Sequence, residues 1–278
     1  MFRYIVPYGW VGIIIIAAAE WLLFQRNSFV SLWCTPLMWT GYIIAADNFV
    51  YKRSGNSMLV KSRLQILLIG IISILSWLIF EGYNILLQNW HYVNLPDAIW
   101  VRYAGYGWSF ATITPGIFVT YDVLWSFAVF NTAKIRQLTI SKNTLMIIML
   151  VSGVLSLYPF IVPNKYLFPL VWVSIIFFID PIVYYLGGKS LFKDLMEGNP
   201  QTVYRLLLAG FICGILWEFW NYWAVTKWIY TVPYFPNYKL FEMPLVGFLG
   251  FPPFAVECYV LYQLAKIILE KAGIKLAY

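Results

Sequence analysis

Charged residues are scarce in this sequence: Asp, Glu, Lys and Arg make up 11% of its 278 residues, against 62% hydrophobic residues. A soluble domain has about 25% charged residues, so this composition is typical of an integral membrane protein. The formal net charge of +7 comes from basic residues scattered between apolar segments, without a basic run. We therefore expect no nucleic-acid partner.

The sequence also lacks the residues that build common cofactor sites. Its single histidine, His91, excludes bis-histidine haem ligation and a histidine-box di-iron centre. Its three cysteines have neither metal-ligand spacing nor a disulfide pattern. Phosphate-loop, catalytic-serine, HExxH, CxxC and dinucleotide-binding motifs are missing, as is a DxxD magnesium site. We expect no metal and no cofactor, and prenyl transfer from a soluble diphosphate is disfavoured.

Long apolar runs are what the sequence has instead. A membrane span needs about 20 mainly apolar residues, and helices are expected because lipid offers no partner to free backbone groups. The first run lacks a small-residue cleavage site, which favours a retained span over a signal peptide. The sequence thus predicts an all-α membrane protein with eight spans, at 5–24, 30–50, 64–87, 103–130, 144–162, 168–187, 206–225 and 245–267.

The basic residues predict the orientation of these spans. Fourteen of the 19 Lys and Arg residues fall on the side that carries both ends of the chain, and five fall on the other side. The positive-inside rule then places both termini in the cytoplasm, and we expect the cytoplasmic membrane of a bacterium or archaeon.

The chain contains a tandem duplication. A shift of 133 positions aligns residues 36–57 with 169–190 at nine identical positions. A shift of 137 aligns four more pairs: Glu81 with Glu218, Asn84 with Asn221, Pro96 with Pro233 and Pro115 with Pro252. We predict two four-helix repeats, residues 1–140 and 141–278, which form one membrane domain. With an even number of spans in each, the repeats share one orientation and are related by rotation about an axis near the membrane normal.

Carboxyl groups recur inside the predicted spans, which hold almost no basic partners. A charge at membrane depth is costly, so several of these groups must be protonated, hydrogen-bonded or in contact with water. Burial raises the pKa of a carboxyl group, which makes it a proton donor near neutral pH. Seven of the twelve carboxylates lie in this position: Glu20, Asp47, Glu81, Asp122, Asp180, Glu218 and Glu257.

Two Glu–Asn pairs are the strongest local feature, Glu81 with Asn84 and Glu218 with Asn221. Residues three apart share one face of a helix, so each amide can hold its carboxyl group and leave the other oxygen for a ligand. Two interpretations stay open. The pairs are either acids that face a central cavity or locks between neighbouring helices.

An aromatic loop follows each pair, with Trp90, His91 and Tyr92 in the first and Trp228 and Tyr230 in the second. Rings beside carboxyl groups can hold an apolar, conjugated or cationic group, so we predict substrate contacts here. The alternative is an anchor at the membrane interface, a role that suits His91 better than that of a catalytic base.

Four further carboxyl groups fall into two kinds: two occur in the second half only, and two repeat near the ends of spans. Glu242 and Glu257 have no acidic counterpart, which makes them candidates for asymmetric catalytic residues. The alternatives are a solvated loop charge for Glu242 and a helix-packing role for Glu257. We expect Asp47 and Asp180 to tie the end of a span to the loop that follows, with a proton route as the alternative.

Residues 47–51, Asp-Asn-Phe-Val-Tyr, resemble the Asp-Asn motif in the second helix of small integral-membrane lycopene cyclases, which are also tandem helical repeats. The segments 90–92 and 228–230 look like the Trp-x-Tyr loop of those enzymes. The segment 241–244 resembles their Pro-x-Glu-Glu helix start in part, without the paired glutamates. Carotenoid hydratase-type membrane proteins carry similar Glu, aromatic and Pro clusters. The resemblance implies acid catalysis on a polyene dissolved in the bilayer.

These features predict a cofactor-independent membrane enzyme, of a cyclase, hydratase or isomerase type, with a membrane lipid or polyprenoid as its ligand. The alternatives are a proton-coupled transporter and a scaffold subunit of a membrane complex. The candidate protein partners are a second copy of the chain, in a homo-oligomer, and another subunit of a membrane complex. In the enzyme, Glu257 or Glu218 would be the acid, and Glu81 and Glu242 would stabilise charge or accept the proton. Asn84 and Asn221 would orient the carboxyl groups.

Cysteine labelling tests the predicted orientation. A cysteine introduced at Asn94, in an outer loop, should react with a membrane-impermeant maleimide in intact cells. A cysteine at Asn56 should react only after the cells are permeabilised. The opposite pattern would reverse the orientation.

Overall fold

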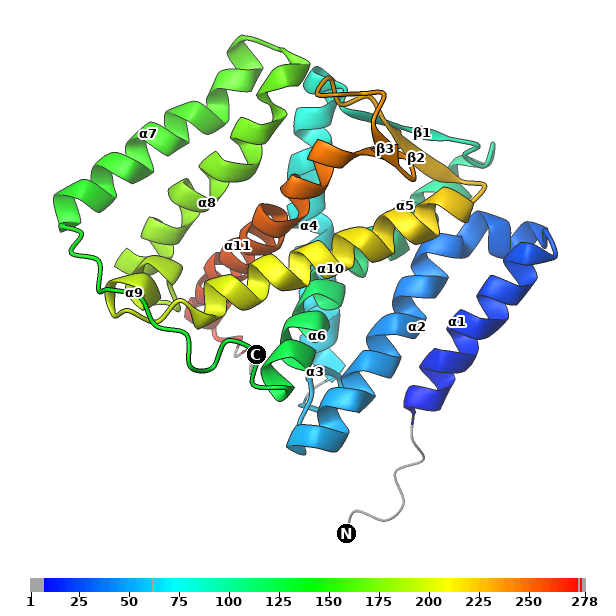
Figure 1. Ribbon diagram of the computed structural model, residues 1–278, viewed down its shortest axis with the longest axis horizontal. Helices are drawn as coiled ribbons and strands as arrows, with labels where there is room; N and C mark the ends of the chain where they lie inside the picture. The colour runs from blue at the N-terminus through cyan, green and yellow to red at the C-terminus, as the bar shows by residue number, and fades with distance from the viewer. Residues whose placement is uncertain (1–7, 62, 275, 277–278) are drawn as a thin grey trace.

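The computed structural model describes residues 8–61, 63–274 and 276, and this part of the chain is almost entirely helical (Figure 1). The long helices are α1 (Gly9–Phe24), α2 (Ser28–Ser54), α4 (Arg63–Leu87), α5 (Ile99–Ala111), α6 (Ile113–Ser126), α7 (Lys142–Ile161), α8 (Phe168–Tyr185), α10 (Gln201–Trp223) and α11 (Phe251–Lys271). The short elements are α3 (Met58–Lys61), α9 (Leu191–Met196), η1 (Lys165–Leu167), η2 (Leu245–Gly250), β1 (Trp90–Val93), β2 (Lys227–Tyr230), β3 (Lys239–Leu240) and β4 (Met243–Pro244).

Six helical segments are long and apolar enough to cross a membrane, so the prediction of a helical membrane protein is confirmed at this level. Residues 5–7 of the predicted span at 5–24 lie outside the described residues. Within the described part, α1 is apolar but its 16 residues are fewer than a span of about 20 requires. Six segments in the described ranges, rather than the predicted eight, reach this length: Ser28–Ser54, Leu64–Leu87, Lys142–Ile161, Lys165–Tyr185, Gln201–Trp223 and Leu245–Lys271.

The predicted span at 103–130 consists of two helices, α5 and α6, which meet at Thr112. Pro115 has no N–H to continue the ladder of hydrogen bonds across this point. Ser73 of α4 bridges the break: its hydroxyl donates to the Phe110 carbonyl at 2.6 Å and accepts from the Thr114 N–H at 2.9 Å. A neighbouring side chain thus replaces the partners that lipid cannot offer.

Two helix hairpins flank a central group of helices (Figure 1). The pair α1–α2 packs on one side, against α6, and the pair α7–α8 packs on the other side, against α11. The helices α4, α6, α10 and α11 lie between them. The strands β1 and β2 lie at one end of the bundle, while α1 begins and α11 ends at the opposite end (Figure 1).

Asp47 and Asp180 tie the ends of α2 and α8 to the segments that follow, as predicted. The Ser57 hydroxyl donates to Asp47 at 2.7 Å, and the Ser190 hydroxyl donates to Asp180 at 2.9 Å. Each carboxylate also accepts from backbone N–H groups at the start of the next short helix, including that of Leu191 at 2.9 Å. Asp47 also accepts from the Tyr8 hydroxyl at 2.5 Å, which links it to the start of α1. These hydrogen bonds fix the ends of helices, and this favours the structural interpretation of both residues.

Replacement of Ser73 tests the bridge between α5 and α6. Ser73→Ala leaves a buried N–H and a buried carbonyl without partners, which should lower the free energy of unfolding by roughly 1–3 kcal/mol. Ser152→Ala is the matched control, because the buried Ser152 hydroxyl bonds only to carbonyl groups of its own helix. Thermal unfolding in detergent measures both changes. An equal, small effect of the two substitutions would contradict the proposed role of Ser73.

Candidate functional site

The ribbon of β1 and β2 brings the two predicted aromatic loops together. The strands pair antiparallel, with Trp90 opposite Tyr230 and Tyr92 opposite Trp228. Side chains alternate between the two faces of a strand, so these four rings share one face of the ribbon. His91 lies on the other face and is exposed. Of the residues predicted to contact substrate, Trp90, Tyr92, Trp228 and Tyr230 thus converge, whereas His91 lies apart from them.

An aromatic cavity of about 140 Å³ lies against this ribbon, between α2, α4, α5, α10 and α11. We refer to it as the outer cavity. Its volume is close to that of a cavity that holds a benzene molecule. Few polar side chains reach it, among them Arg102 and Lys227. Six rings form much of its wall: Trp77, Trp90, Tyr92, Trp217, Trp228 and Tyr230.

Glu81 lies behind three of these rings and accepts a hydrogen bond from each. The indole N–H of Trp77 donates to Oε1 of Glu81 at 2.8 Å, and that of Trp90 donates at 3.2 Å. The Tyr92 hydroxyl donates to the same oxygen at 2.6 Å. Three donors therefore converge on one carboxyl oxygen, an arrangement that stabilises negative charge at this oxygen.

Glu218 occupies the matching position in the second half but has fewer partners. The Trp228 indole donates to its Oε1 at 3.3 Å, and the Tyr230 hydroxyl is also directed at this carboxyl group. The side chain is fully buried, and its Oε2 has no hydrogen-bond partner in the described part of the chain. An unpaired buried charge is expensive, so these surroundings favour the protonated form.

A single difference in sequence explains why the two carboxyl groups differ. The position equivalent to Trp77 in the second half is Gly214, which has no side chain to donate a third hydrogen bond. The ring of Phe251 fills this space: a Cβ atom on Gly214 would lie 2.2 Å from it. The halves therefore hold one well-partnered glutamate and one poorly partnered glutamate.

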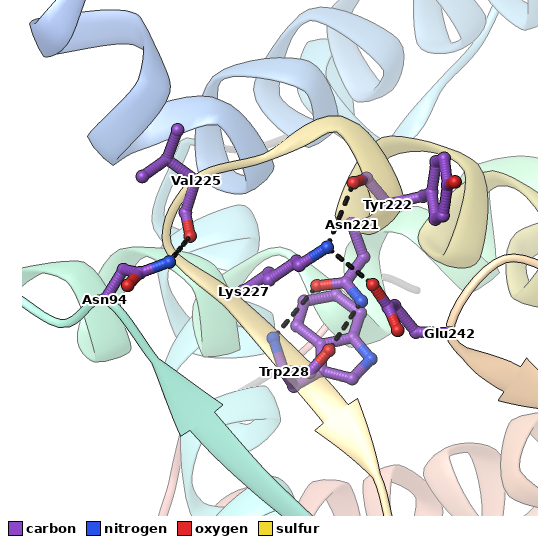
Figure 2. Close-up of polar contacts among 7 residues, drawn as sticks. All are labelled: Asn94, Asn221, Tyr222, Val225, Lys227, Trp228 and Glu242. Carbon is purple, nitrogen blue, oxygen red and sulfur yellow. Dashed lines mark hydrogen bonds and ion pairs between the residues drawn. The ribbon is translucent and has the colours of Figure 1, made fainter.

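The two asparagines have a different role from the one predicted. The Asn84 amide accepts from the backbone N–H groups of Asn89 and Trp90 and donates to the Trp90 carbonyl at 2.9 Å. The Asn221 amide likewise accepts from the Trp228 N–H and donates to the Trp228 carbonyl at 2.8 Å (Figure 2). Both amides therefore hold a strand in place rather than a carboxyl group, and neither lines the outer cavity.

Glu242 forms an ion pair at the rim of the outer cavity rather than a catalytic group within it. Its Oε1 lies 2.5 Å from Nζ of Lys227, and both side chains are largely buried. Lys227 also donates to the Tyr222 carbonyl at 3.3 Å (Figure 2). Nearby, the Asn94 amide donates to the Val225 carbonyl and links the two outer loops (Figure 2). The ion pair with Lys227 explains why an acidic residue lies at position 242 of this loop.

Glu257 is fully buried, and neither of its oxygens has a hydrogen-bond partner among the described residues. It lies one helical turn after Phe254, which lines the outer cavity. In the first half the equivalent residue is Thr120, whose hydroxyl shares a hydrogen bond of 2.7 Å with Tyr42. The residue that matches Tyr42 is Ile175, which cannot form such a bond. Glu257 thus lies at an aligned position where the second half offers no counterpart of the Tyr42 hydroxyl.

Tyr92 and Tyr230 stand between the carboxyl groups and the outer cavity. Burial raises the pKa of both hydroxyls, and the neighbouring Glu81 and Glu218 raise the pKa further. Each hydroxyl therefore keeps its proton at neutral pH and acts as a donor.

Several cavity residues were missed by the sequence interpretation, chiefly Trp77, Trp217, Phe254 and Arg102. Trp77 carried a usable signal, because it lies four residues before Glu81 and so on the same helix face. The others are ordinary members of an aromatic-rich sequence, and only the packing of α10, α11 and α5 selects them.

A second cavity, of about 690 Å³, lies at the end of the bundle opposite to the ribbon. It is polar, with lysines 61, 189, 193 and 266 and four carboxylate residues in its wall, and it shares no lining residue with the outer cavity. Ser190, which binds Asp180, lies at its edge.

Comparison with known proteins gives no relative for the chain: no protein-family model, curated protein or solved structure matches it.

Infrared difference spectroscopy tests the unequal charge states of the carboxyl groups. An ionised group in lipid costs at least about 2.5–3.5 kcal/mol, so the wild type should show a protonated carboxyl band at pH 7. We expect Glu218→Gln and Glu257→Gln each to reduce the intensity of this band and Glu81→Gln to leave it unchanged. Undiminished intensity in both of the first two variants, or a loss of intensity only in Glu81→Gln, would contradict the assignment.

Proposed function

We propose that the protein is an integral membrane enzyme that performs acid/base chemistry on a lipid-soluble substrate, a polyprenoid or carotenoid-like molecule. The observation that carries this proposal is the outer cavity, which is walled by rings and backed by two unequal carboxyl groups. A ring-lined cavity suits an apolar chain. Pairs of acids in different surroundings are a common arrangement for a proton donor and a proton acceptor. The resemblance to membrane carotenoid enzymes points to the same chemistry.

We propose further that the halves are repeats with one orientation. Their contacts match: each asparagine holds a tryptophan backbone, and each glutamate accepts from a tryptophan and a tyrosine. In the ribbon, each tryptophan faces the tyrosine of the other half, as rotation about an axis through the pair His91–Ile229 requires. The basic residues at the other end favour cytoplasmic termini and an outward-facing ribbon.

The acid side of the proposed reaction uses Glu218 and Tyr230. The carboxyl proton of Glu218 passes to the Tyr230 oxygen while the Tyr230 hydroxyl proton passes to one carbon of a substrate double bond. The π electrons of that bond form the new C–H bond, and the neighbouring carbon becomes a cation. Glu257, one turn below the cavity wall, is a second source of this proton.

The base side uses Glu81 and Tyr92. The Tyr92 oxygen takes a proton from a carbon next to the cation while the Tyr92 hydroxyl proton moves to Glu81. The electrons of the broken C–H bond form a double bond at a new position. The substrate is isomerised or cyclised without a co-reactant, and one proton has moved from Glu218 to Glu81. Proton exchange with water then restores the starting state.

A proton-coupled transporter is the second candidate, because the polar cavity opens at the opposite end of the bundle. Transport would need the two cavities to connect through the aromatic residues between them, and a cysteine at Gly188 in the polar cavity would then change its reactivity when ligand is added from the ribbon side. A scaffold is the least favoured candidate, since a pure scaffold has no use for a ring-lined cavity.

Deuterium incorporation tests the proton relay. Lipids extracted from the purified protein identify a candidate ligand, which is then incubated with the protein in D₂O and analysed by mass spectrometry. The wild type should add deuterium to the ligand, and Tyr230→Phe or Tyr92→Phe should slow this by about 10²-fold or more. Tyr106→Phe is the matched control, because Tyr106 lines the cavity without a hydrogen bond to either carboxyl group.

Two results would contradict these proposals. Equal rates in all three tyrosine variants would contradict the relay. No incorporation by the wild type into any extracted or added polyprenoid would contradict the enzyme.

A further inference from the structure

We infer that the outer cavity selects a positive charge on an apolar ligand, whether a quaternary ammonium group or a carbocation. The carbocation form rests on the proposed function, whereas recognition of a bound ammonium group does not. The inference concerns the electrostatics of the cavity wall, which would discriminate between a cation and a neutral group of the same shape.

The rings of the wall are oriented by their polar edges. The N–H groups of Trp77 and Trp90 and the hydroxyl of Tyr92 all point to one oxygen of Glu81, so these edges are directed away from the cavity space. What remains for a ligand is the electron-rich part of each ring, which attracts cations. A donor bound to a carboxylate also polarises its ring, so the charge of Glu81 adds to this attraction.

Two cationic side chains, Lys227 and Arg102, line the cavity and limit where a ligand cation can bind. Lys227 is paired with Glu242 at 2.5 Å, so the two charges largely neutralise each other. Arg102 also lines the cavity, and its Nε and Nη2 donate to the Pro96 carbonyl, a neutral acceptor, at 3.3 and 2.9 Å, so its charge opposes a ligand cation at the α5 side of the cavity. The charged group is therefore expected at the end of the cavity formed by Trp77, Trp90 and Tyr92.

The size of the cavity suits a compact cation. A volume of about 140 Å³ can hold a trimethylammonium group or one isoprene unit, and the rest of the ligand would extend from it.

A pair of probes that differ only in charge tests the inference. Hexyltrimethylammonium and its uncharged carbon isostere 2,2-dimethyloctane are titrated into the full-length protein in nanodiscs, with tryptophan fluorescence as the readout and empty nanodiscs as the partition reference. A desolvated contact of this kind strengthens binding by roughly tenfold or more, so the ammonium probe should bind at least tenfold more tightly than the isostere.

Two substitutions localise the effect. Glu81→Gln keeps an oxygen that accepts from the same three donors but removes the charge, and we expect the preference for the ammonium probe to fall severalfold. Glu20→Gln is the matched control: Glu20 also accepts from an indole, that of Trp220 at 3.4 Å, but neither residue lines the cavity. Retained secondary structure by circular dichroism confirms that each variant is folded.

The outcomes separate the two proposals. Equal binding of both probes by the wild type, or an unchanged preference in Glu81→Gln, overturns the charge-selective cavity. A strong preference for the ammonium probe together with no deuterium incorporation supports this inference and contradicts the proposed enzymatic function.

Discussion

The structure depends on one constraint: a polar group inside the bundle must find its partner inside the bundle, because lipid supplies none. The Ser73 hydroxyl forms hydrogen bonds with the free backbone groups at the break between α5 and α6. Asn84 and Asn221 do the same where helices give way to strands. Asp47 and Asp180 hold the starts of short helices at the other end. These side chains fix the helix ends, and the helix ends place the rings of the outer cavity.

Against this background, the carboxyl groups that lack partners are informative. Most of the repeated acids are paired with donors from their own half, so they cost little and hold local geometry. Glu218, a repeated acid, and Glu257, which has no acidic counterpart, lack such partners, and each case coincides with one residue difference between the aligned segments. Gly214 replaces a donor, and Ile175 replaces a hydroxyl partner. Such positions are retained in a membrane bundle at a cost in stability, which is why we connect them with proton transfer.

The sequence predicted the features that depend on local pattern. Helical spans follow from apolar runs, and the ties made by Asp47 and Asp180 follow from a repeated Asp and Ser ten residues apart. Features that depend on distant pairing were not predictable. A strand of four residues such as β1 has no periodic signal of its own, and its partner β2 lies more than 130 residues away. The roles of Asn84 and Asn221 were missed for that reason, since their amides bind the strands rather than the glutamates three residues before them.

The ribbon between the halves also has a consequence for synthesis of the chain. The first half emerges and inserts with β1 unpaired, and its strand partner is made only after α10 has been translated. Until then the edge of β1 and the rings of Trp90 and Tyr92 have no cover from the second half. The outer cavity therefore cannot exist in a nascent or truncated chain. Its closure marks the moment when both halves are in the membrane and correctly joined.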